Sequence, residues 1–533
     1  MPTGRLNTQV AYIPFLSTQV GPNVLRATEY EKNFVVRAKY VSPSHQDQDI
    51  GIPTPIYGEN ILPMTNGWES VTFTERIKPH KTFRGFNQLI NLKSGTETNI
   101  LYSPAQGKDF VNYDGQWAQG PSYENFAGLV TYAYLKLKTY VFYQRHRIMS
   151  YSYANKAFHG EVLNGLQLTN IDGITTSNNL LIAWNETTIF WSSAIDPLDF
   201  VPSLSSGAGS QNPTQARGKI VCCLPAAGGF IIYTTSNAIF AIWSGNLRYP
   251  WNFVEIPGSA GIRSPEHVSY DANYDGHFAW TPVGLQMVTR GKAESALPEV
   301  TDFLTGKLVE EFIGISGYHP HTNNSKVFNS QTQDWISKVQ GPSLLQQITL
   351  TEDPWVKIAL IGSRYLCISY GYKAKGIYDW VIVYDYSIQR YGKLRVTHTD
   401  LFEYITQTYE QPQVKTMIGI LKADGSVYTV DFAHGIYGEG ILLYGRIQES
   451  NGRWIEVSEI SIQSLRDVNP RLFIIPSYDG VNLENAAAPV QTIDTKNLSQ
   501  WMTRVAGQNV NFLISGTFSV TSITLEFNVL GSR

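Results

Sequence analysis

Short pairs of strand-like segments recur along most of this sequence, and they constrain the fold more than any other feature. Each pair consists of two runs rich in β-branched and aromatic residues around a turn of Gly, Asn or Asp, the pattern of a β-hairpin. In "IGILKADGSVYTVDF", the Asp424-Gly425 pair is expected to supply the positive φ angles of a tight turn. Similar pairs are "GGFIIYTTSNAIFAIWSGN", "DGHFAWTPVGLQMVTRG" and "RYLCISYGYKAKGIYDWVIVYDYSIQRYGKL". The chain is therefore predicted to be all-β.

Two of the hairpins end in the same way, which indicates a repeat. In "TIFWSSAIDPLDF" and "AIFAIWSGNLRYPWNF", the pairs Trp191-Ser192 and Trp243-Ser244 hold equivalent places, 52 positions apart. Four-stranded propeller blades repeat at about 40 to 50 residues, and up to seven weak hairpin units lie between positions 96 and 432. The pattern predicts a β-propeller of hairpin-built blades in which Trp191 packs between blades. A pair of β-sandwiches is the alternative.

The changes of pattern divide the chain into five predicted parts. An insertion interrupts the hairpins and holds the clearest helix, "TDFLTGKLVEEFIG", which begins at Thr301 or Asp302 as its cap and ends at Gly314. The polar stretch Gly317–Trp335 after it is typical of a loop. The parts are an N-terminal strap and part of a platform (1–95), the first part of the propeller (96–297), the insertion with helix and loop (298–353), the remainder of the propeller (354–440) and a C-terminal β-sandwich-like platform domain (441–533).

The scarcity of charged residues indicates that the chain belongs to a larger protein assembly. Charged residues make up 16% of it and apolar residues 43%, against about 25% charged in an average soluble protein, so much of its surface is expected to be covered by other protein. The net charge of −3 argues against a general nucleic-acid binder, which normally has a basic excess. No membrane span or signal peptide is apparent, and Cys222, Cys223 and Cys367, without the spacing of a disulfide or zinc framework, indicate a reducing compartment.

Carboxylate pairs are the first candidates for chemistry. Asp196 and Asp199 lie in a proline-containing turn near Trp191, which resembles the surroundings of a sugar-cleaving site. Glycosidase carboxyls, however, face each other across a bond about 5 to 10 Å apart, whereas residues three apart in one turn usually cap that turn or face solvent. Glu310 and Glu311 are adjacent on the predicted helix, so their side chains diverge and form a solvated edge.

Histidines and a basic segment are the remaining candidates. His319 and His321 are potential metal ligands, but no third ligand lies near them in the sequence. The segment "YVFYQRHRIMSYSY" resembles a surface for base stacking and phosphate contact, although a strand pair with an Arg-rich turn is the favoured interpretation. Its basic residues Arg145, His146 and Arg147 are interleaved with Tyr143, Tyr151 and Tyr153. The sequence thus predicts no catalytic, cofactor-binding or metal residue and no enzyme, and it assigns no residue to a DNA channel or a partner.

Three segments together resemble a known family. The hairpin end "FWSSAIDPLDF", the N-terminal "NGW" (Asn66 to Trp68) and the closing "FLISGTFSVTSITLEFNVLG" are similar to those of tail nozzle and tail hub proteins of short-tailed bacteriophages, including packaged-DNA stabilisation proteins. The resemblance implies a propeller on a platform built from both termini. It also implies six copies around a DNA channel, docked to an adaptor and to tail fibres or spikes, with no catalytic residues.

The leading hypothesis is therefore a virion structural protein of a phage tail, assembled in the bacterial host cytoplasm, which retains packaged DNA and conducts it during ejection. Double-stranded DNA would pass a near-neutral to slightly acidic wall without sequence-specific binding, because a basic lining would hold its closely spaced phosphates. A carbohydrate-binding or carbohydrate-cleaving propeller is the alternative, motivated by Trp191, Asp196 and Asp199. A propeller scaffold that binds peptides is a third hypothesis.

Overall fold

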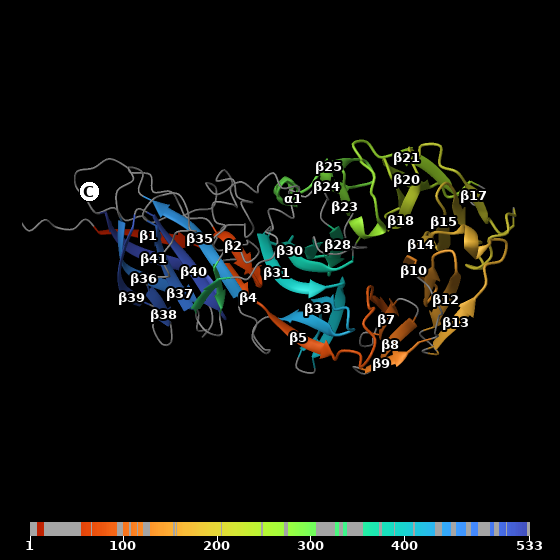
Figure 1. The fold of residues 1–533 in the computed structure, drawn as a ribbon. Coiled ribbons are helices and arrows are strands. Elements are labelled where there is room, and N and C mark those ends of the chain that lie inside the picture. The colour runs from red at the N-terminus through yellow and green to blue at the C-terminus, as the bar shows by residue number, and fades with distance from the viewer. Residues whose placement is uncertain are drawn as a thin grey trace, which may run out of the picture.

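The computed structural model of the chain is an all-β protein with a seven-bladed propeller at one end and a platform of strands at the other (Figure 1). The all-β propeller predicted from the hairpin repeat is thus confirmed. The residues that the structure describes are 8–14, 55–64, 67–92, 100–105, 108–113, 116–120, 128–152, 155, 157–203, 205–246, 249–270, 276–304, 326–329, 334–337, 355–371, 376–388, 390–408, 411–431, 440–448, 455–464, 471–477, 491–494, 500–507 and 509–529.

The first five blades are antiparallel four-stranded sheets whose strands follow one another in sequence. They are blade 1, β6 (Ile90–Leu92), β7 (Ile100–Ala105), β8 (Lys108–Tyr113) and β9 (Gln116–Gln119); blade 2, β10 (Val130–Leu135), β11 (Lys138–Tyr143), β12 (Arg147–Ser152) and β13 (Ala157–Glu161); blade 3, β14 (Gly173–Ser177), β15 (Leu180–Trp184), β16 (Ile189–Trp191) and β17 (Gly209–Gln211); blade 4, β18 (Ile220–Ala226), β19 (Gly229–Thr234), β20 (Ala238–Trp243) and β21 (Trp251–Glu255); and blade 5, β22 (Val268–Tyr270), β23 (His277–Thr281), β24 (Gly284–Val288) and β25 (Ala293–Ser295). The first strands of most neighbouring blades contact one another, as β10 does β14 and β14 does β18, so the first strands form the innermost ring.

The last two blades connect the propeller to the rest of the chain. Blade 6 comprises β28 (Trp355–Ile361), β29 (Tyr365–Gly371), β30 (Tyr378–Asp385) and β31 (Arg390–His398). Blade 7 comprises β32 (Asp400–Thr408), β33 (Gln411–Leu421), β34 (Val427–Asp431) and, as its outer strand, β5 (Thr72–Ile77). Because β5 comes from before blade 1 and pairs with β34, the two ends of the propeller are joined by backbone hydrogen bonds.

The place of β5 in the propeller differs from the predicted division of the chain into domains. The prediction placed residues 1–95 outside the propeller, whereas β5 completes blade 7 and β6 opens blade 1 at Ile90. The physical reason is that β5 has no hairpin partner near it in sequence. Its partners, such as Asp431 opposite Thr72, lie at the far end of the propeller.

The platform combines strands from both ends of the chain. Its first sheet continues blade 6, because β31 pairs with β3 (Ile61–Met64). Beyond β3 follow β4 (Gly67–Ser70), β41 (Ser519–Val529), β36 (Ile455–Ser464) and β39 (Gln500–Gly507), with β1 (Thr8–Pro14) also paired to β41. The second sheet contains β2 (Pro55–Glu59), β35 (Gly440–Gln448), β40 (Asn509–Gly516), β37 (Arg471–Ser477) and β38 (Gln491–Asp494).

The insertion after blade 5 departs from its prediction in two ways. Helix α1 spans Pro298–Leu304 and so begins three residues before the expected cap, with proline at its first position, where the missing N–H costs nothing. Thr301 is therefore inside the helix, and its hydroxyl accepts a hydrogen bond from the Leu285 amide (3.0 Å). The predicted remainder, residues 305–314, lies outside the described residues. Part of the expected loop forms a hairpin instead, β26 (Lys326–Asn329) with β27 (Asp334–Ser337), whose apolar and aromatic residues favour strands.

The turn at Asp424 also differs from the prediction. Gly425 has a φ of 82°, but Asp424 is not in the left-handed region. Its carboxylate instead accepts hydrogen bonds from the Ser426 amide (2.9 Å) and hydroxyl (2.6 Å). This turn therefore relies on an aspartate side chain and one glycine, the arrangement that Asx turns use.

The core lies between the blades. The second strands β15, β19 and β29 are buried along their whole length because neighbouring blades cover both of their faces. One continuous apolar cluster contains side chains of blades 3, 4 and 5. Burial on both faces explains why these strands read as unbroken apolar runs.

Candidate functional site

Trp191 lies inside the interblade core and not in a cleft. Its side chain is 5% exposed and belongs to the apolar cluster of blades 3 to 5, and its indole N–H donates to the Gly207 carbonyl (2.8 Å). It ends the third strand of blade 3, and Trp243 ends the third strand of blade 4. The prediction that Trp191 packs between blades is confirmed.

The two aspartates after Trp191 stabilise the local turn. The Asp196 carboxylate accepts from the Leu198 amide (3.0 Å), and the Asp199 carboxylate accepts from the Val201 amide (3.2 Å) and the Asn164 side-chain amide (3.1 Å). These are the side-chain to backbone bonds of Asx turns. Their geometry fits the structural interpretation of this segment.

The arginines of the basic segment, at the tip of blade 2, form ion pairs. Arg145 lies 2.8 Å from Asp172, and Arg147 lies 3.6 Å from the buried Asp109. Tyr143 and Tyr151 are buried in the core, so their rings are not available to stack on bases. A strand pair with an Arg-rich turn is therefore the better description; Tyr153 lies outside the described residues.

Asp109 belongs to a buried network of polar side chains between blades 1 and 2. The Tyr143 hydroxyl donates to its carboxylate (2.8 Å) and also contacts the Tyr102 hydroxyl. Burial raises the pKa of Asp109 to about 7, against the weaker opposing effect of Arg147. Burial likewise lowers the pKa of Arg147 to about 10, against the attraction of Asp109. At 3.6 Å the pair is longer than a charge-assisted hydrogen bond, so its attraction does not offset the burial.

A second charged cluster lies at the start of the innermost strands of blades 6 and 7. Lys357 lies 2.6 Å from Asp400 and 3.9 Å from Glu266, and Asp400 also accepts from the Leu89 amide (2.7 Å). Burial alone would lower the pKa of Lys357, but the two carboxylates raise it. Tyr132, on the innermost strand of blade 2, is 55% exposed.

A serine–histidine pair in blade 6 resembles part of a hydrolase site but is closed off. The Ser369 hydroxyl and the His398 Nε2 atom are 2.7 Å apart, and the Nδ1 atom is 2.7 Å from the Val396 carbonyl. Because a carbonyl only accepts, Nδ1 carries the proton and Nε2 accepts from Ser369. Burial lowers the pKa of His398 to about 4, and Ser369 is fully buried. The pair therefore stabilises blade 6 and offers substrate no access to the serine.

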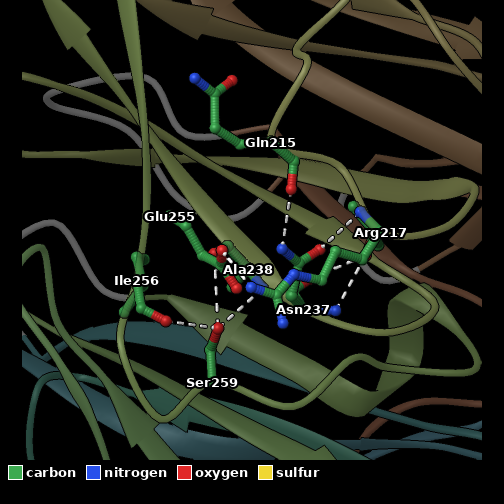
Figure 2. Close-up of polar contacts among 8 residues, drawn as sticks. Gln215, Arg217, Asn237, Ala238, Glu255, Ile256 and Ser259 are labelled. Atoms are coloured by element: carbon green, nitrogen blue, oxygen red, sulfur yellow. Dashed lines mark hydrogen bonds and ion pairs between the residues drawn. The ribbon is translucent and has the colours of Figure 1, made fainter.

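A polar network around Asn237 fastens the connections of blade 4 (Figure 2). The Asn237 side chain accepts from the Thr234 hydroxyl (2.8 Å) and the Arg217 amide (3.2 Å), and it donates to the Gln215 carbonyl (3.0 Å). The Ser259 hydroxyl donates to a carbonyl at the end of blade 4 (2.7 Å). Since these groups satisfy one another, the network ties the loops before and after blade 4 to its central turn.

Other candidates from the sequence yield no site. The three cysteines are buried and unpaired, and burial raises the pKa of each thiol. Glu310, Glu311, His319 and His321 lie outside the described residues. Within the described part of the chain, no three metal-ligating side chains cluster, and no helix is long and apolar enough to cross a bilayer.

One concave site was not apparent from the sequence. A groove of about 670 Å³ lies between blades 6 and 7, and three cationic residues line it: Arg84, Arg395 and Lys422. They come from the segment after β5, the end of β31 and the turn before β34. No short stretch of sequence contains more than one of them, so only the folded blades bring them together.

Comparison with known proteins gives structural similarity only. No protein-family model and no curated protein matches the chain. Solved structures that resemble it include BamB from Moraxella catarrhalis (TM-score 0.33, 8% identity, covering 73% of this chain and 100% of that one) and the computationally designed Ika8 protein (TM-score 0.35, 10% identity, 68% and 100%). YCF48 from Cyanidioschyzon merolae is a third (TM-score 0.35, 12% identity, 67% and 98%). At these TM-scores the similarities carry no argument about function.

Proposed function

We propose that this chain is a virion structural protein, the oligomeric tail nozzle or tail hub of a short-tailed phage. One observation carries the proposal: strands of both termini form the platform, and β31 to β3 pairing makes its first sheet continuous with blade 6. This is the arrangement that the family resemblance implies. A propeller that is fixed to its platform in this way is suited to assembly into a ring, because the propeller and the platform keep the same relative position in every copy.

In the proposed assembly, DNA passes between copies and not through a propeller. On the innermost strands of each propeller the Lys357–Asp400 pair is buried, and Tyr132 is 55% exposed. The net charge of −3 supports a conduit wall that does not retain the duplex. Six copies would surround the channel, with an adaptor on one side and tail fibres or spikes as further partners. No catalytic activity is assigned to the chain.

Mass measurement tests the proposal. Native mass spectrometry of the purified 59.7 kDa chain, and of virions that contain it, is expected to show six-fold assemblies and the chain in the tail. A stable monomer that is absent from virions would rule the proposal out. Purified assemblies are also expected to bind duplex DNA weakly at physiological salt, and a salt-dependent, high-affinity complex would contradict the neutral conduit.

The carbohydrate alternative loses its structural motivation. Trp191 is buried, and both Asp196 and Asp199 are engaged in turn hydrogen bonds. A glycan array and glycosidase assays on the wild type and Asp199→Asn test it directly. Binding or cleavage that depends on Asp199 would restore the alternative.

A further inference from the structure

A small pocket opens on one face of the propeller, where blades 2, 3 and 4 meet. The ends of their first strands, β10, β14 and β18, line it, together with the turn between β14 and β15 and the start of β19. The Ser177 hydroxyl donates to the Gly229 carbonyl (2.8 Å), which holds blades 3 and 4 together at this point. The volume of about 240 Å³ is just below the range of sites for drug-sized ligands, about 300 to 1,000 Å³. The pocket therefore has room for a small ligand with a single ring.

Two adjacent asparagines, Asn178 and Asn179, lie at the rim of this pocket. They form the turn between β14 and β15, both are exposed, and their φ angles are 49° and 61°. Asparagine tolerates this left-handed conformation, but the turn alone does not require it, because the matching turn of blade 2 has similar φ angles at Lys136 and Leu137. Within the part of the chain that the structure describes, no hydrogen bond engages either asparagine side chain. Both amides are therefore available to a ligand.

Tyr134 adds an aromatic surface to the pocket. Tyr132 and Tyr134 are the exposed residues of β10 and, as alternate residues, share one face of that strand. Tyr134 lines the pocket and is 54% exposed, so its ring is accessible to a ligand. The buried Leu135 and the half-buried Pro225 and Ala226 contribute further apolar surface. The pocket thus combines hydrogen-bonding amides with an aromatic ring and aliphatic groups.

The lining of the pocket carries no charge: none of the nine described residues that form it is Asp, Glu, Lys, Arg or His. Two cations lie close by in the sequence or in space, and backbone carbonyls engage both. The Lys136 ammonium donates to the carbonyls of Ala194 and Ile195 (3.2 and 2.9 Å), and the Arg290 guanidinium lies 3.5 Å from the Ala227 carbonyl. A charged ligand would find no counter-charge in the lining, so the pocket suits an uncharged ligand.

We propose that this pocket binds a neutral hexose. A sugar hydroxyl both donates and accepts hydrogen bonds, and an asparagine amide does the same, so Asn178 and Asn179 match neighbouring hydroxyls of one sugar. The C–H face of the sugar ring packs against the Tyr134 ring. An apolar ligand would cover the two amides without bonding to them. The site is distinct from the turn at Trp191 and Asp199 that motivated the carbohydrate alternative. The inference goes beyond the proposed tail function and does not depend on the oligomeric state.

Saturation-transfer NMR and calorimetric titration of the full chain test the proposal, with D-glucose, D-galactose, D-mannose and N-acetyl-D-glucosamine as probes. At least one of these sugars is expected to bind saturably, with one site per chain. Tyr134→Ala, and Asn178→Gly combined with Asn179→Gly, are each expected to weaken that binding tenfold or more. Glycine keeps the left-handed turn and removes the amides. The matched control Ser363→Gly makes the same kind of change in the turn between β28 and β29, where φ is 53°, and should leave binding unchanged.

Each contrary result overturns a definite part of the proposal. Absence of saturable binding for all four sugars, or unchanged affinity in both the Tyr134 and the asparagine variants, rules out the site. Binding that is lost in Asp199→Asn instead places the sugar at the Trp191 turn. Tighter binding of D-galacturonate than of D-galactose identifies an acidic ligand, and binding of adenosine in place of every sugar identifies a nucleobase site. The double asparagine variant is expected to keep the unfolding midpoint of the wild type, so its weaker binding reports contacts with the ligand.

Discussion

Replacement of Asp109 by asparagine should remove a pH dependence of stability that the blade 1–blade 2 interface creates. Burial raises the folded-state pKa of Asp109 from 3.8 to about 7. Folding therefore favours the protonated carboxyl, and the stabilisation is complete below about pH 4 and is lost as the pH rises to 7. The shift of about three units corresponds to about 4 kcal/mol, at about 1.4 kcal/mol per unit. Between pH 5 and pH 8 the wild type is expected to lose about 2 to 3 kcal/mol from this group.

Asparagine is a close match because it stays neutral and its Oδ1 atom can still accept from Tyr143. Chemical unfolding of the wild type and Asp109→Asn at pH 5, 6, 7 and 8 measures the difference between the two proteins. The variant should gain on the wild type by about 2 to 3 kcal/mol over this range. Asp196→Asn, at an exposed turn, serves as the control and should shift stability by less than about 0.5 kcal/mol at each pH. A difference that is constant with pH, or that changes in the opposite direction, would refute the reasoning.

Three further substitutions test the packing, each by equilibrium unfolding of variant and wild type. Trp68→Ala removes a fully buried indole from the junction of blade 6 and platform and should cost about 3 to 5 kcal/mol; a cost below about 1 kcal/mol would contradict its burial. Gly173→Ala places a Cβ 2.3 Å from the Trp184 ring and should cost about 1 to 3 kcal/mol, whereas Gly160→Ala meets nothing within 4 Å and should be nearly neutral; equal effects would refute the assigned packing. Lys357→Met leaves the buried Asp400 carboxylate without its cation and should cost about 3 to 5 kcal/mol; an unchanged midpoint would contradict the assigned pairing.

The repeat at Trp191 and Trp243 was enough to predict the propeller because each blade forms from strands adjacent in sequence. The same locality explains what was missed. β5 reads as an isolated extended segment, and its pairing with β34 has no local signal. The turn at Asp424 was placed correctly, but its backbone conformation depends on hydrogen bonds to Ser426 that a dipeptide rule does not include.

Chemical sites were less predictable than strands for a related reason. The interleaved arginines and tyrosines of blade 2 looked like a binding surface, yet strand alternation buries Tyr143 and Tyr151 in the core. The partner of Arg147 is Asp109 of the preceding blade, which no pattern within blade 2 identifies. Among the residues that line the groove between blades 6 and 7, Arg84 is about 310 to 340 residues from Arg395 and Lys422, so their proximity follows from the ring and not from any motif.

The closure of blade 7 by β5 has a consequence for synthesis on the ribosome. β5 ends at Ile77, and its partner β34 begins at Val427, about 350 residues later. At about 5 to 20 residues per second, β5 waits roughly 20 to 70 s for that partner. Blades 1 to 5 can pair their own strands as they emerge, while the edge of β5 stays unpaired and open to other chains. The interval before the ring closes is therefore the period in which a chaperone or a neighbouring nascent chain has most access to this protein.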